Sequence, residues 1–286
     1  RWPGHRPGKV VLGMSCGSVC QTREQQLRQE YGVHRQFRSW GNWRGVAKDI
    51  REDQAHGRLP WISVKGPNGG PSGWRAVASG RRDGAIRALA RTLKAHDDKP
   101  VLITFHHEPS NDGTEAQGRL WARAYNRFHD VLKARGALRN VADPPILGEW
   151  LFNQRNKRQN PANWVTRGVL KRAPFLGVDL YENNSGETFA QRLPRVLRWM
   201  ARRGFPHKMV GVGESAATSK RYAAKSAVRW INESLNWARR HPNRIGVVSY
   251  FNSTHNSRAK VYWPLDESPR KLRTFRRWLS DRVMVS

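Results

Sequence analysis

The sequence predicts an α/β protein in which one (β/α)8 barrel, or TIM barrel, spans residues 1–286 as a single domain. Short apolar runs alternate with longer amphipathic stretches from end to end, which favours β-α units around a parallel sheet. The apolar runs number eight, and a chain of 286 residues with 38% hydrophobic content has the usual size of one such barrel.

The eight strands of the barrel are expected at the eight apolar runs. These are residues 9–14, 34–38, 59–65, 100–105, 146–150, 175–180, 208–212 and 245–250. An open doubly wound sheet would show the same alternation. However, Gly13-Met14-Ser15-Cys16-Gly17, after the first strand, lacks the glycine spacing of a nucleotide-binding turn, so the closed barrel is preferred.

Helices are predicted between the strands, several with recognisable N-terminal signals. Thr22 and Gln25 form a capping-box pattern, while Asn160-Pro161 and Ser268-Pro269 each place a cap before proline at the first helical position. The other helices are predicted at residues 42–56, 83–94, 115–135, 188–203 and 219–240. Residues 66–73, rich in glycine and proline, are predicted to form the longest loop, on the face where barrels keep their active sites.

Apolar segments give expectations about membranes and export. No apolar run approaches the roughly 20 residues that a membrane span needs, and residues 1–7 lack the apolar centre of a signal peptide. We therefore expect a soluble, secreted monomer with no membrane span, from which any export signal has been removed.

The two cysteines, Cys16 and Cys20, are close in sequence. A local disulfide that closes a short loop is the preferred interpretation, and two buried free thiols are the alternative. The spacing is too short for half of a zinc site unless histidines elsewhere complete it.

Net charge is the most unusual feature of the composition. Lys and Arg number 52 against 22 Asp and Glu, which gives a formal charge of +30. This excess predicts affinity for a polyanion, either a nucleic acid, an acidic glycan or an anionic cell surface. Because the charge is spread along the whole chain, a generally basic surface explains it equally well.

Two glutamates follow predicted strands at the expected mouth of the barrel. Glu108 follows the fourth strand and Glu214 follows the seventh. Residues at the C-terminal ends of barrel strands point into the active site, so the two carboxylates should face each other. Cleavage of a glycoside needs such a pair, one protonated to expel the leaving oxygen and one ionised to attack the anomeric carbon.

This placement resembles the clan of retaining (β/α)8 glycoside hydrolases with catalytic glutamates on strands four and seven. Because His107 stands directly before Glu108, the sequence is most similar to glycoside hydrolase family 26, the β-mannanase family, and less to relatives with Asn there. The resemblance covers residues 9–280. The family's Asn/Gly-Trp stretch after the first glutamate is replaced here by residues 109–112, which leaves the substrate open.

The resemblance implies an endo-acting hydrolase of β-linked mannan or a related β-glycan. Glu108 would be the general acid/base and Glu214 the nucleophile. His107 would hydrogen-bond near the acid/base or the sugar, and Tyr181 would orient Glu214. An arginine at the end of the second strand, Arg38 in preference to Arg35, would keep the nucleophile ionised.

Aromatic residues at other strand ends are candidate sugar contacts. Trp150 could form a platform or pack at the rim. Tyr250 and Phe251 end the eighth strand, where such barrels often carry an aromatic floor for the sugar. Trp263 could line the cleft or pack on the last helix.

Three further carboxylates accompany these strand ends. Glu149 is expected to be structural, because strand alternation turns it away from Trp150. Asp179 and Glu182 flank Tyr181 and are expected either to contact sugar hydroxyls or to pair with surface arginines.

No metal and no cofactor are expected. His106, His107, Glu108 and Asp112 are potential ligands, but adjacent histidines on a strand face opposite sides and cannot bind one ion without distortion. A serine hydrolase is not indicated, since no Gly-x-Ser-x-Gly motif occurs.

The expected function is retaining, endo-acting hydrolysis of a β-linked polysaccharide. One alternative is a hydrolase of an acidic or cell-surface glycan on the same barrel. Another is a barrel that binds glycans or polyanions without cleaving them.

Overall fold

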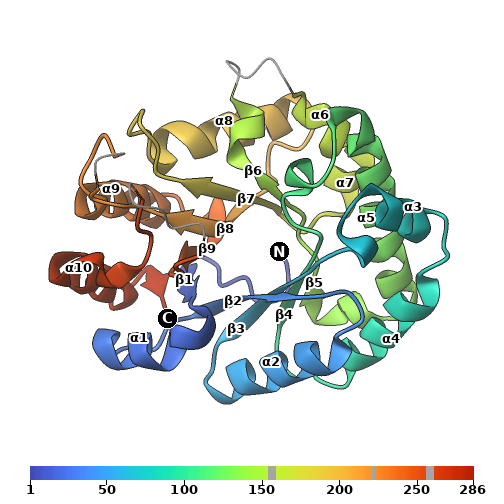
Figure 1. The fold of residues 1–286 in the computed structure, drawn as a ribbon, viewed down its shortest axis with the longest axis horizontal. Coiled ribbons are helices and arrows are strands. Elements are labelled where there is room, and N and C mark those ends of the chain that lie inside the picture. The colour runs from blue at the N-terminus through green and yellow to red at the C-terminus, as the bar shows by residue number, and fades with distance from the viewer. Residues whose placement is uncertain (154–158, 221–222, 256–260) are drawn as a thin grey trace.

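A ring of parallel strands surrounded by helices makes up the fold of this chain in a computed structural model (Figure 1). The structure describes residues 1–153, 159–220, 223–255 and 261–286. Neighbouring strands follow the order β5-β4-β3-β2-β1-β9-β8-β7-β6, and β10 pairs with β1. The predicted (β/α)8 fold class is confirmed.

The strands agree closely with the eight predicted runs, except for two short strands, at residues 141–142 and 284–285, that were not predicted. They are β1 (Val10–Ser15), β2 (Val33–Arg38), β3 (Leu59–Val64), β4 (Val101–Phe105), β5 (Val141–Ala142), β6 (Ile146–Gly148), β7 (Leu176–Tyr181), β8 (Val210–Ala216), β9 (Ile245–Phe251) and β10 (Met284–Val285).

The α-helices form the outer layer of the barrel (Figure 1). They are α1 (Cys20–Leu27), α2 (Trp43–Ala55), α3 (Pro71–Ala78), α4 (Asp83–Lys94), α5 (Gly118–Ala134), α6 (Pro161–Trp164), α7 (Arg167–Arg172), α8 (Phe189–Arg202), α9 (Ala227–Arg240) and α10 (Pro269–Leu279).

The fifth position of the barrel is divided into β5 and β6 by Pro144 and Pro145, which have no N–H to donate to a strand ladder. The ring is nevertheless joined here. The backbone N–H of Glu108 donates to the Ile146 carbonyl at 2.8 Å, and the Thr104 hydroxyl donates to the Pro144 carbonyl at 2.8 Å. The predicted strand 146–150 ends at Gly148, because the next residues turn into a 3-10 helix.

Helix caps decide which predicted helix starts are correct. The side chains of Asn160 and Ser268 accept from the backbone N–H two and three residues ahead, as predicted. Two starts were wrong. Helix α1 begins at Cys20, before the Thr22 pattern, and α9 begins at Ala227, where Ser226 provides the cap, and not at 219.

Part of the predicted loop 66–73 is helical. Helix α3 begins at Pro71, whose fixed φ suits the first helical position, and Pro67–Gly69 before it form a short 3-10 helix in which Asn68 has a φ of 56°. The loop prediction was therefore wrong for the second half of this segment.

Apolar side chains fill the molecule in two layers. The larger layer lies between the strands and the helices. The smaller one fills the barrel toward the N-terminal ends of the strands, where the ring of Phe175 packs against Trp2 at 4.7 Å and Trp61 at 5.8 Å. Because this end is closed by packed rings, a substrate must enter the barrel from the opposite end.

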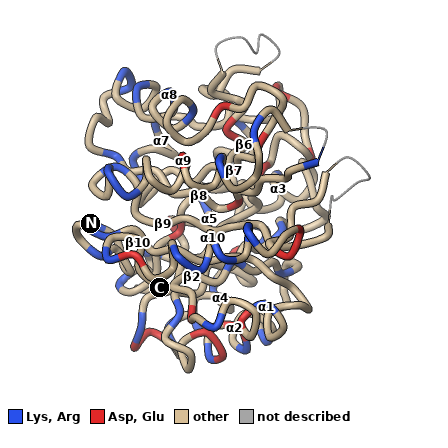
Figure 2. Tube along the Cα trace, turned by 90° about the vertical axis from the view of Figure 1, so that its left-hand side faces the viewer, with Lys and Arg blue, Asp and Glu red and all other residues tan. Residues whose placement is uncertain are grey.

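Cys16 and Cys20 are joined by a disulfide, which confirms the local pairing. Among the described helices none is both long and apolar enough to cross a membrane. Lys and Arg lie along the chain on all parts of the trace shown in Figure 2, in agreement with their spread in the sequence.

Candidate active site

The turn after β4 has a strained backbone. His106 and Glu108 have φ of 40° and 47°, in the left-handed region that side chains other than glycine rarely adopt. Such strain costs on the order of 1–3 kcal/mol per residue and persists where the surroundings impose it, often at functional sites. The surrounding contacts therefore hold this turn in its strained conformation, and the turn sets the direction of Glu108.

His106 is one of the contacts that impose the turn. Its Nδ1 accepts hydrogen bonds from the Gly66 N–H at 3.1 Å and the Trp74 indole N–H at 2.9 Å. Its Nε2–H donates to Asp112 at 2.9 Å, and Asp112 also pairs with Lys65. Burial lowers the pKa of His106 to about 4, so the ring is neutral. These bonds brace the turn while the next side chain, His107, faces the cleft.

Glu214 is directed into the barrel by an irregularity in β8. In the pairing with β7, Val178 lies opposite Val212 but Asp179 lies opposite Glu214, so Gly213 is an additional residue. A β-bulge of this kind re-aims the side chains that follow it. A Cβ at Gly213 would lie 2.6 Å from the Asp179 carboxylate, so this position requires glycine.

Three carboxyl groups meet at the mouth of the barrel. One carboxylate oxygen from each of Glu108, Asp179 and Glu214 lies within 4.8 Å of the others. Retaining glycosidases hold their two carboxyl groups about 5–5.5 Å apart, whereas inverting enzymes leave about 6.5–9.5 Å for a water. The predicted pair, Glu108 and Glu214, is therefore brought together at a separation suited to direct attack.

Glu108 and Glu214 line an open cleft of about 570 Å³. Its lining comes from the ends of five strands and the segments that follow them. The lining residues are Ser15, Gly17, His34, Arg35, Gln36, Phe37, Arg38, His107, Glu108, Glu214, Phe251, Ser253 and His255.

Tyr181 holds Glu214, as predicted. Its hydroxyl donates a hydrogen bond to Oε2 of Glu214. Its ring packs against Phe251 at 5.7 Å and Trp263 at 5.1 Å. The tyrosine therefore fixes one carboxylate oxygen and leaves the other for chemistry.

Replacing Tyr181 by Phe should reduce kcat/KM by roughly 10- to 100-fold, because a hydrogen bond to a charged group contributes about 1.5–3 kcal/mol. The acidic limb of the pH profile should also move to higher pH, since the bond lowers the pKa of Glu214. Tyr262→Phe is the matched control, because that hydroxyl contacts Asp266 at 3.1 Å. Equal pH profiles for Tyr181→Phe and wild type would contradict this role.

The arginine assignment from the sequence was wrong. Side chains alternate along β2, and Arg38 lies on the side that faces α2, where it pairs with Asp49 at 2.5 Å. Arg35 lies on the other side, inside the barrel, 1% exposed, and donates to Ser63 Oγ at 2.7 Å. Its positive charge lowers the pKa of Glu214, so Arg35 takes the role expected of Arg38, which remains at the edge of the cleft.

His107 lies between the catalytic candidates and the cleft wall. Its Nε2 is 3.9 Å from Oε1 of Glu214, and its ring packs against Phe37 at 5.2 Å. Burial, with Arg35 as a further cause, lowers the pKa of His107 well below the usual value, so the imidazole is neutral. A neutral ring here can hydrogen-bond a sugar without competing for the proton of the acid.

The two glutamates have different electrostatic surroundings. Burial, and then the charge of Glu214, raise the pKa of Glu108 to about 7. Burial also raises the pKa of Glu214, but Arg35 and Tyr181 oppose that effect. These surroundings therefore favour the acid form of Glu108 and the ionised form of Glu214, the arrangement that an acid and a nucleophile require.

We expect catalytic activity to fall as the pH rises through about 7. Glu108 acts while protonated, and its pKa is raised, so the acid form is present below that pH and lost above it. The expected decrease in kcat/KM is about tenfold per pH unit above the midpoint. If a Glu108→Gln variant keeps residual activity and the basic limb of its pH profile is unchanged, a group other than Glu108 titrates there.

The predicted aromatic contacts divide into two groups. The prediction that Tyr250 forms part of an aromatic floor for the sugar was wrong. It points out of the barrel toward Phe275 on α10, and its buried hydroxyl donates to the Trp263 carbonyl at 2.7 Å. By strand alternation the next residue, Phe251, faces the cleft instead. Trp263 is 8% exposed and reaches the site through its ring contact with Tyr181.

Trp150 lies at the rim, next to the acid. It is 39% exposed, and a Cβ placed on Gly148 would lie 2.5 Å from its indole nitrogen and 3.5 Å from Oε1 of Glu108. Glu149, in contrast, is buried and pairs with Arg192 at 2.6 Å, in keeping with its expected structural role. An exposed indole beside the acid is placed where a sugar ring could stack.

Asp179 was predicted either to contact sugar hydroxyls or to pair with surface arginines, and the second alternative was wrong. Its position beside Glu108 and Glu214 was not predicted. It lies inside the barrel, 3% exposed, against Glu214, and it does not pair with surface arginines. Burial, and then Glu214 and Glu108, raise its pKa well above the usual value. The alternation signal was present, because Asp179 is two residues before Tyr181 and therefore shares its side of β7. Glu182 points elsewhere and accepts from the Thr218 N–H at 3.1 Å.

Two groups of side chains in the described part of the chain have metal-ligand chemistry. One is the three-carboxylate group at the mouth of the barrel, and the other is Cys16, Cys20 and His34. The adjacent histidines 106 and 107 do point to different sides, as the predicted alternation requires.

Comparison with known proteins identifies shared architecture. No protein-family model matches the chain, and no curated protein matches it in sequence. Among solved structures it is similar to an endo-β-1,4-mannanase double mutant from Cellulomonas fimi, at 16% identity and a TM-score of 0.64, covering 99% of this chain and 72% of that one. A fungal β-1,4-galactanase matches at 15% identity and a TM-score of 0.66, covering 94% and 99%. An endo-β-1,4-glucanase from Xanthomonas axonopodis pv. citri matches at 13% identity and a TM-score of 0.63, covering 94% of this chain and 99% of that one. At such low identity these likenesses show the fold.

Proposed function

We propose that this protein is a retaining glycoside hydrolase that cleaves a β-linked polysaccharide internally. The observation that carries the proposal is the separation of Glu108 and Glu214, whose nearest oxygens lie within 4.8 Å, together with the raised pKa of Glu108. The similar structures are titled as β-1,4-mannanase, β-1,4-galactanase and β-1,4-glucanase, which supports a β-glycan substrate. Mannan is the first candidate, on the resemblance of His107-Glu108 to family 26.

The reaction proceeds in two displacements. In the first, the Glu108 carboxylic acid donates its proton to the glycosidic oxygen while Glu214 attacks the anomeric carbon and forms an ester. In the second, the Glu108 carboxylate takes a proton from water, which attacks the same carbon and releases Glu214. Arg35 and Tyr181 stabilise the Glu214 carboxylate before and after each cycle. No metal or cofactor is required by these steps.

We propose internal cleavage because the similar structures include an endo-β-1,4-mannanase and an endo-β-1,4-glucanase. We further propose a monomer that acts outside the cytosol, where the Cys16–Cys20 disulfide persists.

The test is hydrolysis of a panel of mannans, β-glucans, galactans, xylans and uronic-acid polymers. Oligosaccharides that appear early as a range of lengths indicate internal cleavage. NMR of the first product should show the β-anomer before mutarotation, since double displacement retains configuration. An initial α-product would overturn the retaining mechanism, and no hydrolysis of any polymer would overturn the function.

A second pocket on the same face favours an acidic glycan as an alternative substrate. Its volume is about 450 Å³, and it lies between the segments after β6 and β7 and helix α8. Arg195, Arg198 and Arg202 line it together with asparagines 153, 183 and 184. Arg195 pairs with Glu187, whereas Arg198 and Arg202 are exposed and form no ion pair with described residues. Guanidinium groups bind carboxylates in a bidentate geometry.

If the substrate is acidic, replacing both Arg198 and Arg202 by Gln should raise KM for a uronic-acid polymer by roughly tenfold or more, with little change in kcat. KM for neutral polymers should not change. A double variant with Arg139→Gln and Arg240→Gln is the charge-matched control, since both lie outside this pocket. Equal KM changes in the two double variants would assign the effect to net charge alone.

A further inference from the structure

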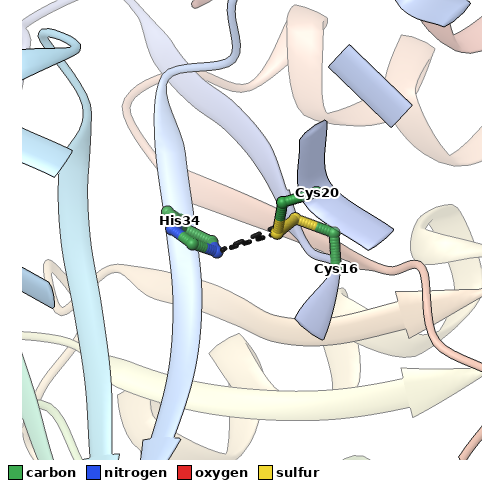
Figure 3. A group of neighbouring side chains, drawn as sticks. All are labelled: Cys16, Cys20 and His34. Carbon is green, nitrogen blue, oxygen red and sulfur yellow. Dashed lines mark hydrogen bonds between the residues drawn. A yellow bond between two sulfur atoms is a disulfide. The ribbon is translucent and has the colours of Figure 1, made fainter. Parts of the chain in front are cut away.

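Figure 3 shows a group of sulfur and imidazole side chains in which the Cys16–Cys20 disulfide lies beside the ring of His34, a residue that lines the cleft. Cys16 directly follows β1, Cys20 is the first residue of α1, and His34 comes from β2. His34 Nε2 is 3.7 Å from Cys16 Sγ and 3.5 Å from Cys20 Sγ. The proposed glycosidase reaction uses none of these three side chains, so their arrangement has a separate explanation.

The orientation of the His34 ring is fixed by a contact on the side away from the two sulfurs. Its Nδ1 lies 2.7 Å from Oδ1 of Asp53, and the other oxygen of Asp53 accepts from the Gln36 amide at 2.7 Å. Asp53 is 1% exposed on helix α2. With Nδ1–H donated to this carboxylate, the lone pair of Nε2 points at the two sulfurs. The same carboxylate–histidine pairing orients histidine ligands at zinc sites.

The distances from the His34 imidazole to the two sulfurs fit tetrahedral coordination, whereas the sulfurs, now bonded to each other, must move apart when the disulfide is reduced. Zn–S bonds of about 2.3 Å and Zn–N bonds of about 2.1 Å place N and S ligands about 3.6 Å apart around one ion. The two N···S distances, 3.5 and 3.7 Å, already have this length. His34 is the histidine from elsewhere in the chain that such closely spaced cysteines need, and with it the three residues between them fit the C-x2–4-C spacing of zinc sites.

We propose that Cys16, Cys20 and His34, once the disulfide is reduced, form a binding site for a thiophilic divalent cation such as Zn²⁺. With a phosphine as the reductant, the atoms and electrons of the reduction balance as follows. The phosphorus gives two electrons to the disulfide and takes oxygen from water to become a phosphine oxide, and the two water protons go to the sulfurs. The cation then displaces both thiol protons to solvent. Disulfide and metal site are therefore alternative states of one cluster.

The residues around the two cysteines and His34 can stabilise a thiolate and a bound ion. The Tyr31 hydroxyl is 3.5 Å from Cys16 Sγ, where it can donate to a thiolate. Three protein ligands leave the fourth coordination position to water. Because His34 also lines the cleft, the ion would be bound at the cleft wall.

The experiment measures Zn²⁺ and Co²⁺ binding by the full chain, without oxygen, before and after treatment with a phosphine. Reduced protein should bind about one Zn²⁺ per chain, and oxidised protein should not. Co²⁺ should give thiolate-to-cobalt charge transfer in the near ultraviolet and the visible bands of a tetrahedral site. Asp53→Asn should weaken binding about 10- to 100-fold, as loss of a carboxylate behind a histidine ligand does.

Variants separate this site from adventitious binding. His34→Gln and the double variant Cys16→Ser, Cys20→Ser should lose the Co²⁺ spectrum, whereas His241→Gln, whose Nδ1 contacts the Trp237 carbonyl on α9, should keep it. Binding that persists in the Cys16→Ser, Cys20→Ser variant, or that is the same in His34→Gln and wild type, overturns the proposal. The double serine variant also contains no thiol, so its folding tests whether the disulfide is structurally required. Binding can be measured whether or not the chain hydrolyses a glycan.

Discussion

Replacing Glu214 by Ala is expected to abolish hydrolysis, with kcat reduced by at least about 10⁴-fold. Among the described residues that line the cleft, the only other carboxylate is the acid/base Glu108; Asp179 does not line the cleft, and burial raises its pKa well above the usual value. The measurement is kcat on the best polymer of the panel, with circular dichroism to confirm folding. Glu233→Ala is the matched control, since that carboxylate pairs with Lys225 and Arg229 on the outer surface.

Azide distinguishes the nucleophile from the acid/base. In Glu214→Ala, the small anion can enter the space left by the carboxylate and attack the anomeric carbon of a substrate with a good leaving group. The expected product is a glycosyl azide of inverted configuration. In Glu108→Ala the loss should be about 10²- to 10⁴-fold on polysaccharide and much smaller on an activated aryl glycoside, which needs no acid. The same loss on both substrates would contradict the role of Glu108.

Replacing Arg35 by Met is the second change with a large expected effect. Arg35 is 1% exposed, and its charge acts on Asp179, Glu214 and Glu108. Without it the three carboxyls lose their common cation, so the pKa of Glu214 should rise further above its usual value. Glu214 would then be protonated over much of the working range, and kcat/KM at pH 6 should fall by roughly 10²-fold.

The pH profile and thermal unfolding measure this change together. The acidic limb should move to higher pH, and the variant should be less stable, because a buried charge cluster loses a partner. Arg38→Met is the matched control, with the same substitution on the same strand but on the side that faces Asp49. If Arg38→Met shifts the acidic limb and Arg35→Met does not, the original assignment of Arg38 is restored.

Periodicity and strand ends were sufficient to predict the barrel and its two glutamates. Apolar runs located the strands within a few residues, because a buried parallel strand needs continuous apolar sequence. The direction of the Glu214 side chain is harder to predict than the position of its strand. Val210 and Val212 pack against the helices, so strict alternation would turn Glu214 outward, and only the additional residue Gly213 reverses its direction. A bulge depends on the register with the neighbouring strand, which the sequence does not display.

Other errors came from alternation that was visible but not applied. On β2, Arg35 and Arg38 are three residues apart and must lie on opposite sides of the strand. On β9, Phe251 and Tyr250 are adjacent and cannot both face the sugar. Asp179 shares its side of β7 with Tyr181 for the same reason. By contrast, Asp53 approaches His34 from another helix, and a contact of this kind across elements cannot be read from local sequence.

The base of the barrel has a consequence for how the protein can be handled. Trp2 packs among the rings that close this end, and β10 near the other terminus pairs with the start of β1, Val10 opposite Met284. Both ends of the described chain are therefore anchored on the side opposite the carboxylates. A fusion partner, affinity tag or solid support attached at either end should leave the cleft open to a long polymer. Immobilised protein should accordingly be able to degrade polysaccharides too large to reach a site that faced the support.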